Sequence, residues 1–190
     1  VKSKPLREND LSIPITLYGI SKNTQTNIAQ YYAKNKNLPV ITFRLFAPYG
    51  KYDSSGRLMA DLMCALINKT RVKLGDKNAI RDFIYIDDVI DALILGSKKS
   101  VPSGEIFNVG TGIGHTVYQV FDEVQKIGKR RIDASWNNKD RTREFDKTKS
   151  KNVANIDKIK DMLKWKPKNS LKTGLVKTYK WYDENIELYK

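Results

Sequence analysis

Segments typical of helices and of strands alternate along the chain, and this alternation constrains the fold more than any other feature. Residues 40–46 (VITFRLF) form a nearly continuous apolar run, which is typical of a strand buried on both faces of a parallel sheet. Helical periodicity precedes this run at residues 19–36 and follows it at residues 58–67. Further strand signals lie at residues 72–74, 82–86 and 105–109. The pattern predicts an α/β protein.

Polar side chains mark the starts of several predicted helices. The carboxylate of Asp87 can cap a helix that begins there. Thr116 and Gln119 have the spacing of a capping box, in which each side chain satisfies a backbone N–H of the other residue. Asn155 is the predicted cap of a short helix that ends at Leu163, and a last helix is expected from Ser170.

Composition limits the class of protein. With 190 residues, of which 40% are hydrophobic, the chain can bury one good core or a core plus a small satellite domain. Trp181 and Tyr182 are expected to anchor the last helix to the core. No apolar run approaches the roughly 18 residues of a membrane-spanning helix, so we expect a cytoplasmic protein. Cys64 is the only cysteine and His115 the only histidine, which disfavours a disulfide framework, a Ser-His-Asp hydrolase and a metal site.

The net charge of +14 requires an interpretation. Residues 129–190 hold 18 Lys and Arg against 9 Asp and Glu. A basic surface for nucleic acid is one interpretation. However, acidic residues are interleaved, as in residues 157–161 (DKIKD), and no zinc-ligand or RNA-binding motif accompanies them. A solvated lysine-rich surface is therefore favoured, with some arginines available for the phosphates of a small ligand.

Tyr18 and Lys22 suggest redox chemistry on an alcohol. Their spacing of four residues at the start of a predicted helix places a phenol and an ammonium on one face, one turn apart. The ammonium favours the phenolate, so the tyrosine can take a proton from a hydroxyl group as hydride leaves its carbon. The Tyr-x-x-x-Lys pattern alone also occurs in ordinary amphipathic helices.

The order of further motifs makes this pair more specific. Five motifs follow one another along the chain: residues 18–22 (YGISK), 44–50 (RLFAPYG), 81–89 (RDFIYIDDV), 107–110 (FNVG) and 163–167 (LKWKP). In this order the chain resembles the extended short-chain dehydrogenase/reductase family, whose members are NAD(P)-dependent nucleotide-sugar epimerases, dehydratases and 4-ketoreductases. The resemblance extends from about residue 14 to residue 181.

The resemblance implies catalytic and cofactor-binding roles for some residues and a substrate contact for another. Tyr18 matches the catalytic acid/base, and Lys22 matches the lysine that lowers its pKa and binds the nicotinamide ribose. Phe46 falls where the family's strand end meets the nicotinamide, although it can equally be a core phenylalanine. Arg57 stands near where relatives contact the nucleotide, although an arginine at a helix start can also face water.

Other arginines are implied to bind substrate. Arg81 matches an arginine that reaches the phosphates or sugar, with a local ion pair to Asp82 or Asp87 as the alternative. Either Arg141 or Arg143 corresponds to the arginine that clamps the diphosphate, with a solvated charged loop as the alternative.

The resemblance also implies the domain organisation. We expect the C-terminal part of a Rossmann-like doubly wound parallel sheet plus a small α/β substrate-binding domain. Residues 1–50 correspond to a remnant of the NAD(P)-binding domain with the Tyr-x-x-x-Lys helix. Residues 51–190 correspond mainly to the nucleotide-sugar-binding domain, with some elements returning to the Rossmann sheet.

The chain departs from the family pattern in two respects. No G-x-x-G-x-x-G motif is present and the sequence begins at Val1, so we expect an N-terminally truncated chain that has negligible activity alone. Ala47 stands where many relatives have an asparagine that contacts substrate, and alanine cannot form that hydrogen bond.

The intact enzyme is expected to transfer hydride at C4 of a nucleotide-linked hexose, with NAD or NADP as cofactor. Epimerase, dehydratase and reductase remain alternatives, and the loop at residues 49–59 favours a 4-ketoreductase for 6-deoxyhexoses. A non-catalytic binding module and a basic nucleic-acid-binding protein are the other classes. Relatives often form homodimers through the tyrosine helix, and Ile28, Tyr31 and Tyr32 can supply an apolar face or belong to the core.

Overall fold

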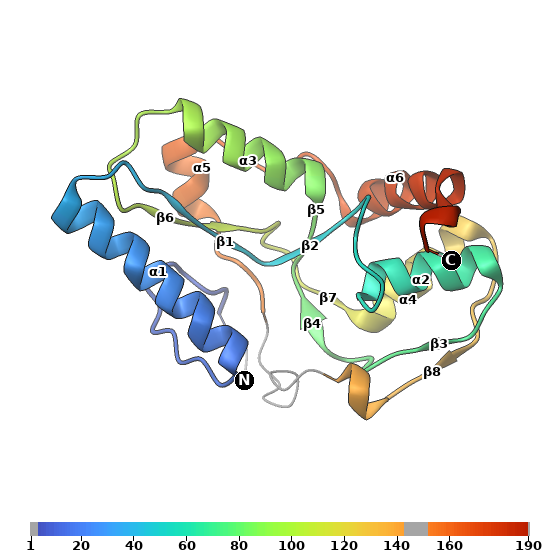
Figure 1. Cartoon of the computed structure of the whole chain (residues 1–190). Helices are drawn as coiled ribbons and strands as arrows, with labels where there is room; N and C mark the ends of the chain where they lie inside the picture. Colours follow the sequence, from blue (N-terminus) through green and yellow to red (C-terminus); the bar gives the residue numbers. More distant parts are fainter. Residues whose placement is uncertain (1–3, 143–151, 190) are drawn as a thin grey trace.

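The computed structural model describes residues 4–142 and 152–189 (Figure 1). Its α-helices are α1 (Leu17–Lys36), α2 (Leu58–Asn68), α3 (Ile86–Lys98), α4 (Val117–Gly128), α5 (Asp157–Leu163) and α6 (Leu171–Glu184). Its strands are β1 (Thr42–Leu45), β2 (Ala47–Tyr49), β3 (Val72–Lys73), β4 (Ile80–Arg81), β5 (Phe83–Tyr85), β6 (Ile106–Val109), β7 (His115–Thr116) and β8 (Ala134–Ser135). Two 3-10 turns, η1 (Lys139–Arg141) and η3 (Ile186–Tyr189), complete the described elements.

Most of the strand pairs are parallel, as expected for an α/β protein. β1 pairs with β6, β2 with β5, and β3 with β8 in parallel, whereas β4 and β7 are antiparallel. The strand predicted at residues 40–46 contains β1, and a second strand, β2, follows directly after Phe46. The Phe46 N–H donates to the Val109 carbonyl of β6, whereas the Ala47 N–H donates to the Asp82 carbonyl beside β5. The chain therefore changes strand partner at this point and connects two parts of the molecule.

Two apolar cores lie on either side of this connection. The first surrounds β6 and includes buried side chains of α3 and α5, and Figure 1 shows α1 on the opposite side of β1 and β6 from α3. The second is larger and is formed by α2, α4 and α6 against β2 and β5. Tyr182 in α6 is fully buried in the second core, which confirms its predicted anchoring role. The predicted division at residue 50 stays a prediction.

Two buried carboxylates bind neighbouring backbone segments together. Asp82 accepts from the Thr111 N–H and hydroxyl, the Gly112 N–H and the Ala154 N–H, at 2.5–3.1 Å. Asp88 accepts from the N–H groups of Lys168 and Asn169 and from the Asn169 amide nitrogen, at 3.0–3.1 Å. Both aspartates are almost completely buried, so these bonds replace the solvation of the carboxylates.

The predicted helix caps are confirmed in part. Thr116 and Gln119 form the capping box of α4, and Ser170 caps α6. The prediction for Asp87 is wrong: α3 begins at Ile86 after Tyr85, and the Asp87 carboxylate instead lies 3.7 Å from the Lys51 ammonium. The reason is that the strand β5 continues directly into the helix, which leaves no extended residue at position 87 to serve as a cap.

The cap of α5 is also displaced. Ile156 occupies the N-cap position, and Asn155, one residue earlier, accepts from the Asp157 N–H through its side-chain oxygen.

Within residues 4–142 and 152–189, no helix is sufficiently long and apolar to cross a membrane.

Candidate active site

Tyr18 and Lys22 lie on one face of the first turns of α1, as their spacing predicted. Thr16 caps this helix by accepting from the Gly19 N–H at 3.0 Å, which fixes where the helix begins. The Lys22 ammonium lies 5.6 Å from the centre of the Tyr18 ring and donates to the Gln25 side-chain oxygen at 3.1 Å. The Tyr18 side chain is 72% exposed. A phenol and an ammonium are therefore adjacent and accessible to a ligand.

A separate pocket of about 150 Å³ collects most of the other predicted site residues. Phe46, Arg57, Arg81 and Arg141 all line it. Arg57 immediately precedes α2, Arg81 ends β4, and Arg141 ends η1. Segments that are distant in sequence thus deliver three guanidinium groups to one pocket, an arrangement suited to phosphate groups.

Close backbone packing brings the last of these arginines to the pocket. A side chain at Gly75 would place its Cβ 2.6 Å from the Arg141 carbonyl oxygen, so only glycine allows the η1 turn to approach. The N–H groups of Asn137 and Asn138 donate to the Gly75 and Leu74 carbonyls at 3.1 and 3.0 Å. The turn is therefore fixed against the chain that leaves β3.

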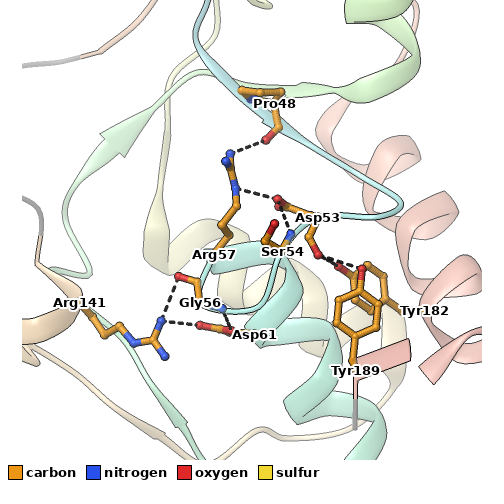
Figure 2. A network of polar contacts seen from close by, with 9 residues as sticks. All are labelled: Pro48, Asp53, Ser54, Gly56, Arg57, Asp61, Arg141, Tyr182 and Tyr189. Atoms are coloured by element: carbon orange, nitrogen blue, oxygen red, sulfur yellow. Dashed lines mark hydrogen bonds and ion pairs between the residues drawn. The ribbon is translucent and has the colours of Figure 1, made fainter. Parts of the chain in front are cut away.

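Arg57 and Arg141 are held by carboxylates rather than extended into water (Figure 2). The Arg57 Nε lies 2.7 Å from an Asp53 oxygen, and its terminal nitrogen donates to the Pro48 carbonyl at 3.3 Å. A terminal nitrogen of Arg141 lies 2.8 Å from an Asp61 oxygen and donates to the Gly56 carbonyl at 3.0 Å. Arg57 is therefore anchored at one edge of its guanidinium group, while 46% of its side chain is exposed.

The two acids bind the backbone as well as the arginines. Asp61 accepts from the Gly56 N–H at 2.8 Å, and Gly56 has a φ of 86°, a conformation that favours glycine. Asp53 accepts from the Ser54 N–H at 3.1 Å. Burial raises the pKa of the Asp53 carboxyl, although the charge of Arg57 and the bond from Ser54 act in the opposite direction.

The charge of the pocket remains positive after these acids are counted. Its cations are Arg57, Arg81, Arg141 and Lys73, and its acids are Asp53, Asp61 and Asp76. The pocket can therefore accept an anionic group whose oxygens compete with the acids for the guanidinium donors.

The acid/base pair and the pocket are distinct in this chain. Among the described residues that line the pocket, Tyr18 and Lys22 do not appear. Arg143 lies outside the described residues. The sequence interpretation missed Asp53 and Asp61. Asp53 precedes its partner Arg57 by four residues, which is also the spacing of helical ion pairs, whereas the partner of Asp61 is Arg141, which is distant in sequence.

A second cleft, of about 700 Å³, lies between the loop after β6, α4 and the segment before α6. It is larger, but it contains none of the predicted site residues that the structure describes; it includes His115, whose functional role the sequence did not support. Among residues 4–142 and 152–189 there is no cluster of His, Cys, Asp and Glu that could hold a metal ion. The arginine pocket is therefore the better candidate for substrate.

The parallel α/β fold with a Tyr-x-x-x-Lys helix defines a member of the extended short-chain dehydrogenases/reductases. Residues 2–110 match the family described as the NAD dependent epimerase/dehydratase family, and the chain belongs to it. The recognition made from the motifs is thereby confirmed, as is the fold class.

Relatives of known activity cover nearly the whole chain. It is 29% identical over 195 residues to UDP-glucuronate 4-epimerase of Thermodesulfobacterium geofontis, covering 100% of this chain and 57% of that protein. The structure resembles UDP-glucose 4-epimerase of Thermotoga maritima with UDP-glucose, with a TM-score of 0.85 and 29% identity over 98% of this chain and 59% of that one.

A dehydratase is similar to the same extent. The dTDP-glucose 4,6-dehydratase of Bacillus anthracis, in complex with NAD, has a TM-score of 0.84 and 26% identity, covering 98% of this chain and 58% of that one. The chain therefore spans less than two thirds of the length of each of these proteins, which act on nucleotide sugars by name and, in the last case, bind NAD.

Proposed function

We propose that this chain provides the acid/base pair and the nucleotide-sugar pocket of an NAD(P)-dependent epimerase or 4-ketoreductase that transfers hydride at C4 of a nucleotide-linked hexose. The observation that carries the proposal is the convergence of Arg57, Arg81 and Arg141 on one pocket, in a chain of the epimerase/dehydratase family. Planar guanidinium groups bind the oxygens of a diphosphate in pairs, which fixes the nucleotide and leaves the sugar to be oriented separately.

Phe46 connects the pocket to the first core, which supports a position for the sugar between the arginines and the acid/base helix. It follows β1 directly, and it lines the pocket beside Ala47. Because Ala47 offers no side-chain hydrogen bond where many relatives have asparagine, the arginines are proposed to carry more of the substrate orientation.

Tyr18 is proposed to exchange the proton of the C4 hydroxyl group, with Lys22 favouring its phenolate electrostatically. These side chains fit a nicotinamide cofactor, since both are accessible and the Lys22 ammonium donates to the neutral side chain of Gln25. Lys22 would hold the ribose hydroxyls, and Phe46 would contact the nicotinamide. The cofactor, when bound, supplies the hydride acceptor and donor.

Apolar side chains of α1 and β1 are exposed. Leu17 and Ile20 of α1 and Leu45 of β1 are 86%, 48% and 43% exposed. We propose that the NAD(P)-binding part of the enzyme covers these side chains, which would also desolvate Tyr18. Homodimer formation through Ile28, Tyr31 and Tyr32 stays a prediction.

Titration calorimetry with UDP, dTDP, GDP and their hexose conjugates tests the substrate assignment on the chain as it is. We expect binding of at least one nucleoside diphosphate, a loss of at least 10-fold in affinity for Arg81→Ala, and no change for the control Arg131→Ala, an exposed arginine outside the pocket. Equal binding by both variants would contradict the proposal.

Turnover tests the reaction. In the presence of the cofactor-binding part of the enzyme, Tyr18→Phe is expected to retain nucleotide-sugar binding and to lose turnover. Net NADPH consumption identifies a reductase, whereas sugar interconversion without net cofactor change identifies an epimerase. Binding without turnover by the unmodified chain under these conditions would instead support a non-catalytic module.

A further inference from the structure

The C-terminal end of the chain reaches the loop that carries Arg57. The hydroxyl groups of Tyr182 in α6 and Tyr189 in η3 both donate to one acceptor, the carbonyl oxygen of Asp53, at 3.1 and 2.8 Å (Figure 2). Their rings are in contact, with centroids 4.6 Å apart. Tyr182 is completely buried, so the geometry of this contact is fixed by the second core.

Asp53 transmits this contact to the pocket. Its carbonyl group is held by the two tyrosines, while its carboxylate lies 2.7 Å from the Arg57 Nε. Arg57 in turn donates to the carbonyl group of Pro48, a residue of β2 that lines the pocket. A single residue therefore connects the C-terminal aromatic cluster to a guanidinium group of the proposed diphosphate site.

Elsewhere, the loop is held at Gly56, which Asp61 and Arg141 bind, and at Lys51, whose ammonium lies 3.7 Å from Asp87. Residues 51, 52 and 54–57 are exposed, and Tyr52 adopts a φ of 61°, which is unfavourable for a residue with a side chain. The Tyr52 ring packs on Trp181 of α6, with centroids 4.7 Å apart. The same C-terminal segment thus holds both the carbonyl and the aromatic side chain of this loop.

We propose that Tyr182 and Tyr189 are positioning residues for Arg57, so that the C-terminal turn η3 sets the affinity of the pocket for a diphosphate. The proposal rests on the proposed function, because it takes the anion in the pocket to be a nucleoside diphosphate. Neither tyrosine is a catalytic residue, since each acts through Asp53 on Arg57.

Tyr189→Phe tests this, because phenylalanine keeps the ring contacts and removes one donor. The probes are UDP and dTDP, compared with the nucleosides uridine and thymidine. We expect the dissociation constant of the diphosphate to rise about 3- to 10-fold, with nucleoside binding unchanged. Tyr31→Phe, an exposed tyrosine of α1, is the matched control and is expected to leave both unchanged.

A double-mutant cycle distinguishes positioning from general loosening. In an Arg57→Ala background, Tyr189→Phe is expected to have no further effect on diphosphate affinity, because the group that it positions is absent. Additive losses, or equal losses for diphosphate and nucleoside, would overturn the proposal. Tyr182→Phe provides a second variant at the same acceptor.

Hydrogen exchange separates this proposal from the proposed function. If the unmodified chain binds neither diphosphate, the proposed function fails. The effect of the two tyrosines on the Asp53 loop can still be measured without a ligand. Tyr189→Phe is then expected to accelerate exchange of the Ser54 N–H, which donates to the Asp53 carboxylate, and not of the Gly19 N–H at the start of α1. Unchanged exchange at Ser54 would overturn the positioning role.

Discussion

The helix α1 carries Tyr18 and Lys22, and α2 begins directly after Arg57, but the two helices contribute to the core to different degrees. Among the residues of α1, all of which the structure describes, Ala33 is the one that is buried, whereas α2 buries Met59, Ala60, Leu62, Met63, Ala65 and Leu66. Lys22 of α1 bonds to its own helix, whereas the arginines beside α2 are bound by acids that also hold loop backbone.

This difference separates two ways of building a functional site. The arginine pocket is preorganised within the chain, so its residues affect both stability and binding. The proposed acid/base pair lies on a helix that contributes little to the core, so substitutions there are expected to affect the proposed chemistry more than the stability. Four predictions test this contrast, in order of decreasing effect.

The largest effect is expected at Asp82, which follows Arg81 and fixes the end of β4. Asp82→Ala leaves the N–H groups of Thr111, Gly112 and Ala154 without their acceptor in a buried environment. At about 1–3 kcal/mol for each unsatisfied group, the free energy of unfolding should fall by roughly 4 kcal/mol or more. Urea unfolding measures this loss, and Asp161→Ala, an exposed acid of α5, is the control. If Asp82→Ala lowered the free energy of unfolding no more than Asp161→Ala does, the pocket side of the molecule would not be preorganised in the way that we infer.

Arg141 is expected to have a smaller effect, and on binding. Arg141→Ala removes a donor from the pocket and leaves Asp61 without its ion-pair partner. The affinity for a nucleoside diphosphate should fall about 10- to 100-fold, since hydrogen bonds between charged groups contribute about 1.5–3 kcal/mol. Lys139→Ala, an exposed cation two residues earlier in the same turn, controls for the loss of charge alone. An equal loss of affinity in the two variants would indicate a diffuse electrostatic effect.

His115 pairs with Arg81 across β4 and β7, and its titration reports on this ladder. Burial lowers the pKa of His115, although the charge of Asp82 acts in the opposite direction. Because the unfolded chain then binds more protons than the folded chain just below pH 6.5, stability should decrease as the pH falls through about 6.5 toward the folded-state pKa.

A single histidine makes this measurement direct. The proton NMR signal of its imidazole gives the folded-state pKa without assignment, and His115→Gln should remove the corresponding pH dependence of unfolding. A folded-state pKa above the ordinary value would reverse the predicted sign.

Local patterns in the sequence predicted part of what local interactions determine. The capping box of α4 depends on residues three positions apart and is present, whereas the cap predicted at Asp87 is wrong, because α3 begins one residue earlier. The second strand, β2, directly after the predicted strand at residues 40–46, was not predicted, because it depends on a change of partner: Phe46 bonds to Val109 and Ala47 to Asp82, which are distant in sequence.

The candidate site shows the same limit. The resemblance identified Arg57, Arg81 and Arg141, all of which line the pocket. It did not identify Asp53, whose carbonyl group is bound by Tyr182 and Tyr189, 129 and 136 residues later in the chain. The anchoring role of large aromatic residues near a terminus predicted that Tyr182 is buried, but it gives no information on where the hydroxyl group finds its partner.

The smallest effect on stability is expected at Tyr18, although it is the residue most important to the proposed chemistry. Its side chain is 72% exposed, and phenylalanine keeps the ring over which Lys22 lies. Tyr18→Phe should therefore change the free energy of unfolding of this chain by less than about 0.5 kcal/mol. Urea unfolding of Tyr18→Phe and of Asp82→Ala, measured side by side, gives the smallest and the largest expected change in the free energy of unfolding. A loss above about 1 kcal/mol would show that α1 depends on the phenol for its own structure, and the distinction between the preorganised pocket and the exposed acid/base face would no longer hold.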